Sequence, residues 1–98
     1  MDATQAMGTF QHSVEAFGDA AADELVRSGS GYKAARKNMV KHYRNRKAEI
    51  TNMVEAFSRR PWAAPEHLAI RQVADHALAT LDGIYRDMRQ ALDTLYRD

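Results

Sequence analysis

The sequence contains no cysteine, only two prolines and five glycines, and no long hydrophobic run. Without cysteine the chain has no disulfide, no cysteine–zinc site and no thiol nucleophile. No apolar run approaches the roughly 20 residues that are needed to span a membrane. The first residues, "MDATQAMGTFQH", lack the basic and apolar regions of a signal peptide. We therefore expect a cytoplasmic protein that has no membrane partner.

The chain also has little excess charge. Its formal net charge is +1 and its pI is about 8.1, which is below the value of about 9 that is typical of dedicated nucleic-acid-binding domains. Hydrophobic residues make up 45% and charged residues 28% of the 98 residues, as in ordinary soluble domains. A chain of this length and composition is expected to form one domain, residues 1–98.

Two short segments interrupt an otherwise helical pattern. Glycine and serine gather in "RSGSG" at 27–31, and proline occurs twice in "RRPWAAP" at 59–65. Such clusters are typical of turns. Elsewhere apolar residues recur every three or four positions, which predicts helices over about 3–27, 31–59 and 65–97. Trp62, in the second turn, is expected to cap one end of the core.

The third helix has the widest apolar face. Its stripe from Ile70 to Leu95 follows a 4-3-4-3 spacing, and Leu78, Tyr85 and Leu92 form part of a second row. We therefore expect this helix to pack on both other helices, or on one of them and on another chain. The predicted fold is all-α: an antiparallel up-down-up three-helix bundle with coiled-coil-like packing. The alternative is an elongated dimer that is built from the same helical hairpins.

Charge is strongly patterned along this nearly neutral chain. Residues 1–31 carry five acids and one base, whereas residues 32–60 carry nine bases and two acids. In a hairpin that turns at 28–31, the acids of the first helix come level with bases of the second. The acid and base predicted to lie at the same height along the hairpin are Asp23 and Arg36, Asp19 and Lys41, and Glu15 and Arg44. Along the third helix, pairing is expected four residues apart, for Arg71–Asp75, Asp82–Arg86, Arg89–Asp93 and Asp93–Arg97.

The segment "YKAARKNMVKHYRNRK" at 32–47 holds seven lysines or arginines and no acid. Helical geometry points Lys33, Lys37, Lys41 and Arg44 away from the predicted core, and we call these four residues the basic ridge. Such a ridge serves as a solvated face, meets an acidic protein surface, or tracks nucleic-acid phosphates. The absence of a known nucleic-acid motif and of interleaved exposed aromatics favours protein over nucleic acid.

Arg46 is an exception to the pattern of the second helix. It falls on the stripe that is predicted to be buried, between Tyr43 and Ile50, and a buried guanidinium needs a carboxylate or several carbonyls as partners. One interpretation is that Arg46 extends to the edge of the core and bonds a neighbour such as Asp82. The other is that it marks an interface with a partner.

Few residues suggest catalysis or metal binding. In "RQVADH", Arg71 and His76 have the Arg-x4–6-His spacing of HEPN-type ribonucleases, which the short stretch resembles. That resemblance implies ribonuclease activity at a dimer cleft. His12, Glu15, Asp19 and Asp23 occupy successive helical turns, but they lack a fourth ligand of the kind that zinc sites use. We expect neither a metal nor a cofactor.

These observations predict a small, non-enzymatic helical interaction protein of the adaptor, co-chaperone or phage-type inhibitor kind. It would dock on an acidic protein surface or protein complex, and the expected contacts are Lys33, Lys37, Lys41, Arg44 and Arg46. The alternative is nucleic-acid binding through the same ridge, and a more remote alternative is a HEPN-like ribonuclease. The wide apolar face of the third helix also predicts a homodimer.

Overall fold

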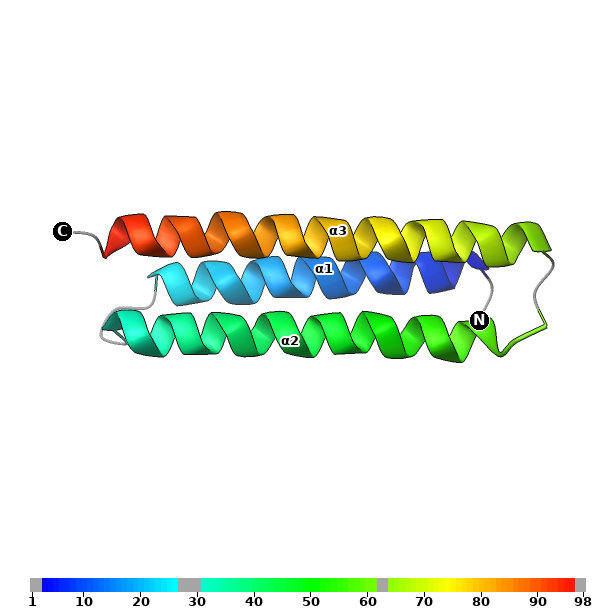
Figure 1. Cartoon of the computed structure of the whole chain (residues 1–98), viewed down its shortest axis with the longest axis horizontal. Coiled ribbons are helices and arrows are strands. Elements are labelled where there is room, and N and C mark those ends of the chain that lie inside the picture. Colours follow the sequence, from blue (N-terminus) through cyan, green and yellow to red (C-terminus); the bar gives the residue numbers. More distant parts are fainter. Residues whose placement is uncertain (1–2, 27–30, 62–63, 97–98) are drawn as a thin grey trace.

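The computed structural model describes residues 3–26, 31–61 and 64–96. Three helices, α1 (Ala3–Val26), α2 (Gly31–Ser58) and α3 (Ala64–Leu95), account for nearly all of them. All three pack against one another and lie side by side in a rod of 54 × 16 × 15 Å (Figure 1). The all-helical prediction is confirmed, and each helix boundary lies within about two residues of its predicted position. Trp62, the predicted cap, lies outside the described residues.

The starts of α2 and α3 follow from local backbone preferences. Gly31 begins α2 with a φ of +75°, a left-handed conformation that glycine adopts without steric cost. Pro65 lies in the first turn of α3, where its missing N–H would have had no helical partner. The turn residues that the sequence contains therefore also define where the next helices begin.

The core is formed by the apolar stripes of all three helices. Phe10, Phe17, Met39, Ile50 and Leu81 are completely buried, as their spacing predicts. Two polar residues are buried with them on α1. Ser13 is fully covered and Glu24 retains only 3% of its exposure, although periodicity alone does not distinguish them from their exposed neighbours.

The last turns of α3 depart from the predicted stripe. Ala91 is exposed and Leu95 is 57% exposed, whereas Leu92 from the second apolar row is completely buried. Figure 1 shows that α3 extends beyond the described end of α1. We attribute the difference to this length mismatch, because the side of α3 that faces α1 has no described partner there.

Most of the wide apolar face of α3 is covered within one chain. This helix contacts both α1 and α2, and Leu78, Ile84, Tyr85 and Met88 pack against the buried core. The sequence left open whether the second neighbour belonged to this chain or to another. Because α2 covers that side, the apolar face of α3 supplies no separate argument for a dimer.

Contacts between α1 and α2 are both aromatic and polar along the helices. Phe10 packs edge-on against Phe57 with ring centroids 5.8 Å apart, and Phe17 lies 6.1 Å from the Tyr43 ring. Near the end of α1, Glu24 accepts a hydrogen bond from Asn38. Successive residues of α1 thus meet successively earlier residues of α2.

The four tyrosines of the chain lie along the contact between α2 and α3. Tyr43 stacks on Tyr85 with centroids 4.2 Å apart, and Tyr32 lies 5.8 Å from Tyr96. The Tyr43 hydroxyl donates a hydrogen bond to Asp82. The Tyr32 hydroxyl donates one to Asp93. These contacts tie two half-buried rings of α2 to carboxylates on α3.

The predicted pairing along α3 is wrong, and for Asp82 and Asp93 the tyrosine contacts explain why. Arg71–Asp75, Asp82–Arg86 and Arg89–Asp93 are not ion pairs in the described part of the chain. Asp82 and Asp93 bind hydroxyl groups of α2 instead, and Arg86 lies 3.8 Å from Asp87. The fourth predicted pair involves Arg97, which lies outside the described residues.

These tyrosine contacts predict a loss of stability at alkaline pH. The hydrogen bond to Asp93 raises the pKa of Tyr32 above its ordinary value of 10.0, and the bond to Asp82 raises the pKa of Tyr43 likewise. The folded state therefore holds both protons more tightly, and stability should fall as the pH rises above about 10.

The measurement is urea unfolding between about pH 8 and 11. The Tyr32→Phe/Tyr43→Phe variant should be less stable than wild type at pH 8, because it lacks both hydrogen bonds, but its stability should fall less steeply with pH. An equally steep fall in this variant would contradict the role of the two hydroxyl groups.

Candidate docking surface

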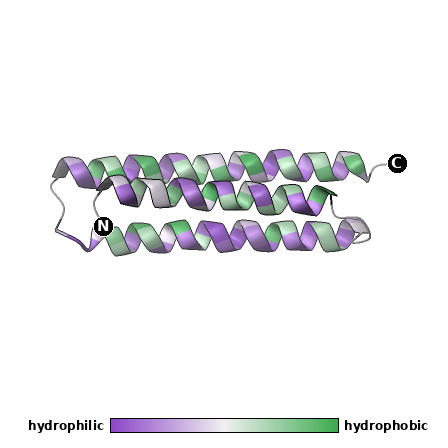
Figure 2. Cartoon of the chain, turned by 180° about the vertical axis from the view of Figure 1, so that it is seen from behind, coloured by the Kyte–Doolittle hydropathy of each residue, from purple (hydrophilic) through white to green (hydrophobic). Residues whose placement is uncertain are grey.

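The basic ridge lies on the outside of α2. Lys33, Lys37, Lys41 and Arg44 are all exposed, and none of them is in an ion pair within the described part of the chain. Spacings of three and four residues place them on one helical face about 16 Å long. Figure 2 shows hydrophilic residues along much of α2. The ridge is therefore accessible to a partner.

A shallow hollow of about 860 Å³ follows the ridge. Tyr32 and Val40 contribute apolar surface to it, and Arg36 adds a fifth cation beside the four of the ridge. None of the lining residues is acidic. A ligand here would meet concentrated positive charge around a small apolar centre, which suits a negatively charged surface.

The charges of α1 do not neutralise the ridge directly. The predicted levels paired Asp23 with Arg36 and Glu15 with Arg44, yet neither pair is an ion pair among the described residues. Glu15 instead accepts a hydrogen bond from Gln11 on its own helix. At most, these acids act on the ridge at longer range, where solvent weakens the interaction.

Arg46, the fifth predicted contact, does not extend the ridge. Its guanidinium donates to Glu49 at 2.9 Å on the same helix, and its side chain is 34% exposed. Glu49 in turn accepts a 2.5 Å hydrogen bond from Ser13 of α1. Arg46 does reach the edge of the core, but its acidic partner is Glu49 and not Asp82. It therefore belongs to the contact between α1 and α2.

A second polar contact between α1 and α2 surrounds Glu24. Its carboxylate accepts a hydrogen bond from Asn38 at 3.4 Å and lies 4.0 Å from the His42 imidazole. The sequence alone did not identify Glu24 as buried, because it stands next to the exposed Asp23 and residue type does not distinguish the two acids. Its position could have predicted the burial: Glu24 lies seven residues after the core residue Phe17, so both lie on one helical face.

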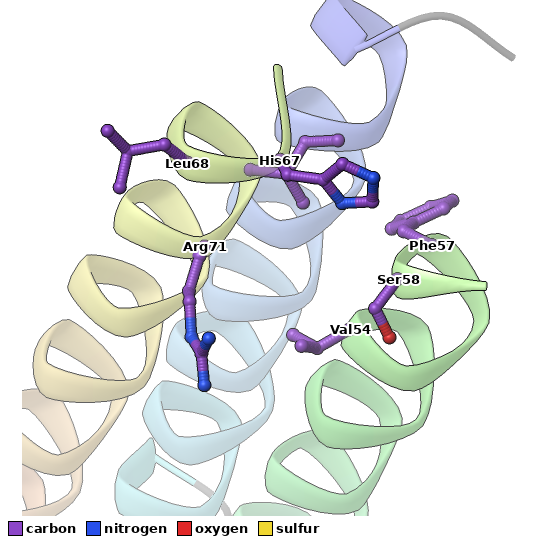
Figure 3. A pocket seen from close by; sticks show the side chains of 7 residues that line it. Val54, Phe57, Ser58, His67, Leu68 and Arg71 are labelled. Carbon is purple, nitrogen blue, oxygen red and sulfur yellow. The ribbon is translucent and has the colours of Figure 1, made fainter. Parts of the chain in front are cut away.

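A hollow of about 500 Å³ lies where α2 ends and α3 begins. In Figure 3 His67 points toward Phe57, whereas Leu68 points away from α2. Val54 and Ile70 add apolar surface. Phe57 and Ile70 were predicted as the end of one apolar stripe and the start of another. The hollow between them depends on the relative placement of α2 and α3, which the stripes do not specify. The size suits a small ligand, and the lining residues identify none.

The ribonuclease-like spacing does not form a joint site in this chain. Arg71 lines the hollow beside Val54 and Phe57, whereas His76 lines another one beside Met7 and Val14 of α1. Five residues along a helix rotate a side chain by about 140°. The Arg71 and His76 side chains consequently face different neighbours. Together they could act on one substrate only if a second molecule brought another copy of one of them close.

Residues 3–26, 31–61 and 64–96 contain neither a metal-binding cluster nor a membrane-spanning helix. No three histidine or acidic side chains there are close enough to hold a metal ion. In the same ranges, no helix combines the length and hydrophobicity that crossing a bilayer requires. His12, Glu15, Asp19 and Asp23 are each exposed, so they form an open row instead of a cluster.

Comparison of the chain with known protein families, characterised proteins and solved structures finds no match.

Proposed function

We propose that this protein is a small, non-enzymatic interaction module that docks on an acidic macromolecular surface through the basic ridge of α2. The observation that carries the proposal is the set of four exposed cations at helical spacing, without an ion-pair partner in the described part of the chain. An adaptor, a co-chaperone and a phage-type inhibitor all act by such stoichiometric docking. Arg46 would contribute indirectly, by holding α2 against α1 through Glu49.

The arrangement of the helices supports a rigid docking face. The contacts of Phe10 with Phe57 and of Glu24 with Asn38 are those expected of an antiparallel up-down-up bundle. Met39 and Ile50 anchor the inner side of α2 in the core. The outer side is then presented without rearrangement, and its charge would mainly accelerate encounter with an acidic partner.

The proposal is tested by capture of partners from an extract of the native cell. Lys37→Glu/Lys41→Glu should lose the partners that wild type captures. The matched control is Arg71→Glu/Arg86→Glu, which reverses two exposed arginines of α3 and changes the net charge equally. This control should capture the same partners as wild type. Equal capture by all three proteins would show that the ridge is not the docking site.

Nuclease treatment of half of each sample separates the two classes of partner. A protein partner should survive the treatment, whereas a nucleic-acid partner should be lost. In the latter case the logarithm of affinity should fall with the logarithm of salt concentration with a slope of about −3 to −4, as expected for four phosphate contacts. The charge alone fits both classes. The ring of Tyr32, the aromatic beside the ridge, already packs 5.8 Å from the Tyr96 ring, and its hydroxyl is bound to Asp93, so it is less available to stack on a base, which favours a protein partner.

A further inference from the structure

The exposed face of α1 carries a row of acids. Glu15, Asp19 and Asp23 follow one another at intervals of four residues, and all three are exposed. None of them is in an ion pair within the described part of the chain. We call these residues the acidic row. Successive carboxylates stand about 6 Å apart along the helix axis, so the row is about 12 Å long.

Three of the four residues of the basic ridge have the same repeat. Lys33, Lys37 and Lys41 are also four residues apart and exposed, so their ammonium groups too are spaced by about 6 Å along the helix. These three lysines and the acidic row have opposite charge, equal spacing and equal length, and Arg44 continues the ridge beyond them. If α1 and α2 of different molecules lay side by side in the same direction, three oppositely charged pairs would align. They are Glu15 with Lys33, Asp19 with Lys37, and Asp23 with Lys41.

The fold prevents these rows from pairing directly within one molecule. The sides of α1 and α2 that face each other are occupied by Ser13 with Glu49 and by Glu24 with Asn38. Those contacts fix the rotation of both helices. The acidic row and the basic ridge are consequently left exposed on two different helices.

We infer that the basic ridge binds the acidic row of a second copy of this chain. The inference rests on the proposed function and names its partner: a helix with a carboxylate at every fourth residue. The chain itself carries such a helix. Because exposed ion pairs are individually weak and screened by salt, the association is weak, reversible and strongest at low ionic strength. Because α1 and α2 run in opposite directions within one molecule, this pairing sets the two copies antiparallel. They join in a two-fold dimer when both pairs of rows meet, and in an open chain when only one pair meets.

Sedimentation velocity of the full chain at high protein concentration tests the inference. Wild type should associate at about 20 mM salt and be monomeric at about 500 mM salt. Lys37→Glu/Lys41→Glu and Asp19→Lys/Asp23→Lys should each weaken association by at least about tenfold. An equimolar mixture of the two variants should associate again, because each then offers the charge that the other needs.

The control is Arg71→Glu/Arg86→Glu, which matches the net charge of the first variant but retains both rows. It should associate like wild type. Wild type that remains monomeric at low salt, loss of association in the control, or failure of the mixture to associate would each overturn the inference. Circular dichroism verifies that every variant is folded, and Lys37→Gln/Lys41→Gln replaces the reversal if that variant unfolds.

The proposed function can survive the failure of this inference. If wild type is monomeric at low salt but Lys37→Glu/Lys41→Glu still loses a cellular partner, the ridge docks on a different protein. If neither self-association nor partner capture depends on the ridge, both proposals fail.

Discussion

Replacing Phe17 with alanine is expected to destabilise the protein by about 3–5 kcal/mol, as deletion of a buried phenylalanine ring does in other cores. Phe17 is completely buried, and its ring lies 6.1 Å from that of Tyr43 on α2 and 6.3 Å from that of Tyr85 on α3. It is thus a side chain of α1 that touches both other helices. A domain of this size has a total stability of about 5–10 kcal/mol, so the variant should be close to unfolding.

Urea unfolding monitored by far-ultraviolet circular dichroism measures this loss. The matched control is Leu68→Ala, which also shortens an apolar side chain but at a position that is 58% exposed. Its stability should remain within about 0.5 kcal/mol of wild type. Similar losses in the two variants would mean that Phe17 does not connect the three helices as described.

Ile50→Ala should have the second largest effect, a loss of about 2–4 kcal/mol. The buried residues of α2 are Ala35, Met39, Ile50 and Phe57, fewer than a 28-residue helix commonly buries in a bundle core. Several other contacts of this helix are polar, such as the hydrogen bond between Ser13 and Glu49. Ile50 is completely buried, so its removal leaves a cavity in the part of α2 where Met53 and Val54 are only partly buried.

A graded series at this position separates packing from other causes. Ile50→Val should cost about 1 kcal/mol, since it removes one methyl group. Thr51→Ala, at an exposed neighbouring position, should change stability by less than about 0.5 kcal/mol. If Ile50→Ala were as stable as Ile50→Val, α2 would be held mainly by its polar contacts and not by its apolar stripe.

Polar contacts were the part of the structure that periodicity could not predict. The spacing of charges along α3 suggested pairs within that helix, but Asp82 and Asp93 bind Tyr43 and Tyr32 of α2. For Arg46, the sequence suggested an acid on another helix, and the partner is Glu49 on its own helix. For each of these side chains, the sequence offered several possible partners at suitable helical spacings, and spacing could not choose among them.

The sequence by itself determined the three helices, their boundaries to within about two residues, most of the core and the four cations of the basic ridge. These features depend on turn residues and on helical spacing, which are local properties. Tertiary structure decided that Glu24 is buried beside Asn38 and His42, and that Glu15, Asp19 and Asp23 form no ion pair with α2 in the described part of the chain. Hydrogen bonds and ion pairs require atoms within a few ångströms, so they depend on helix rotation and axial offset, which spacing alone leaves undefined.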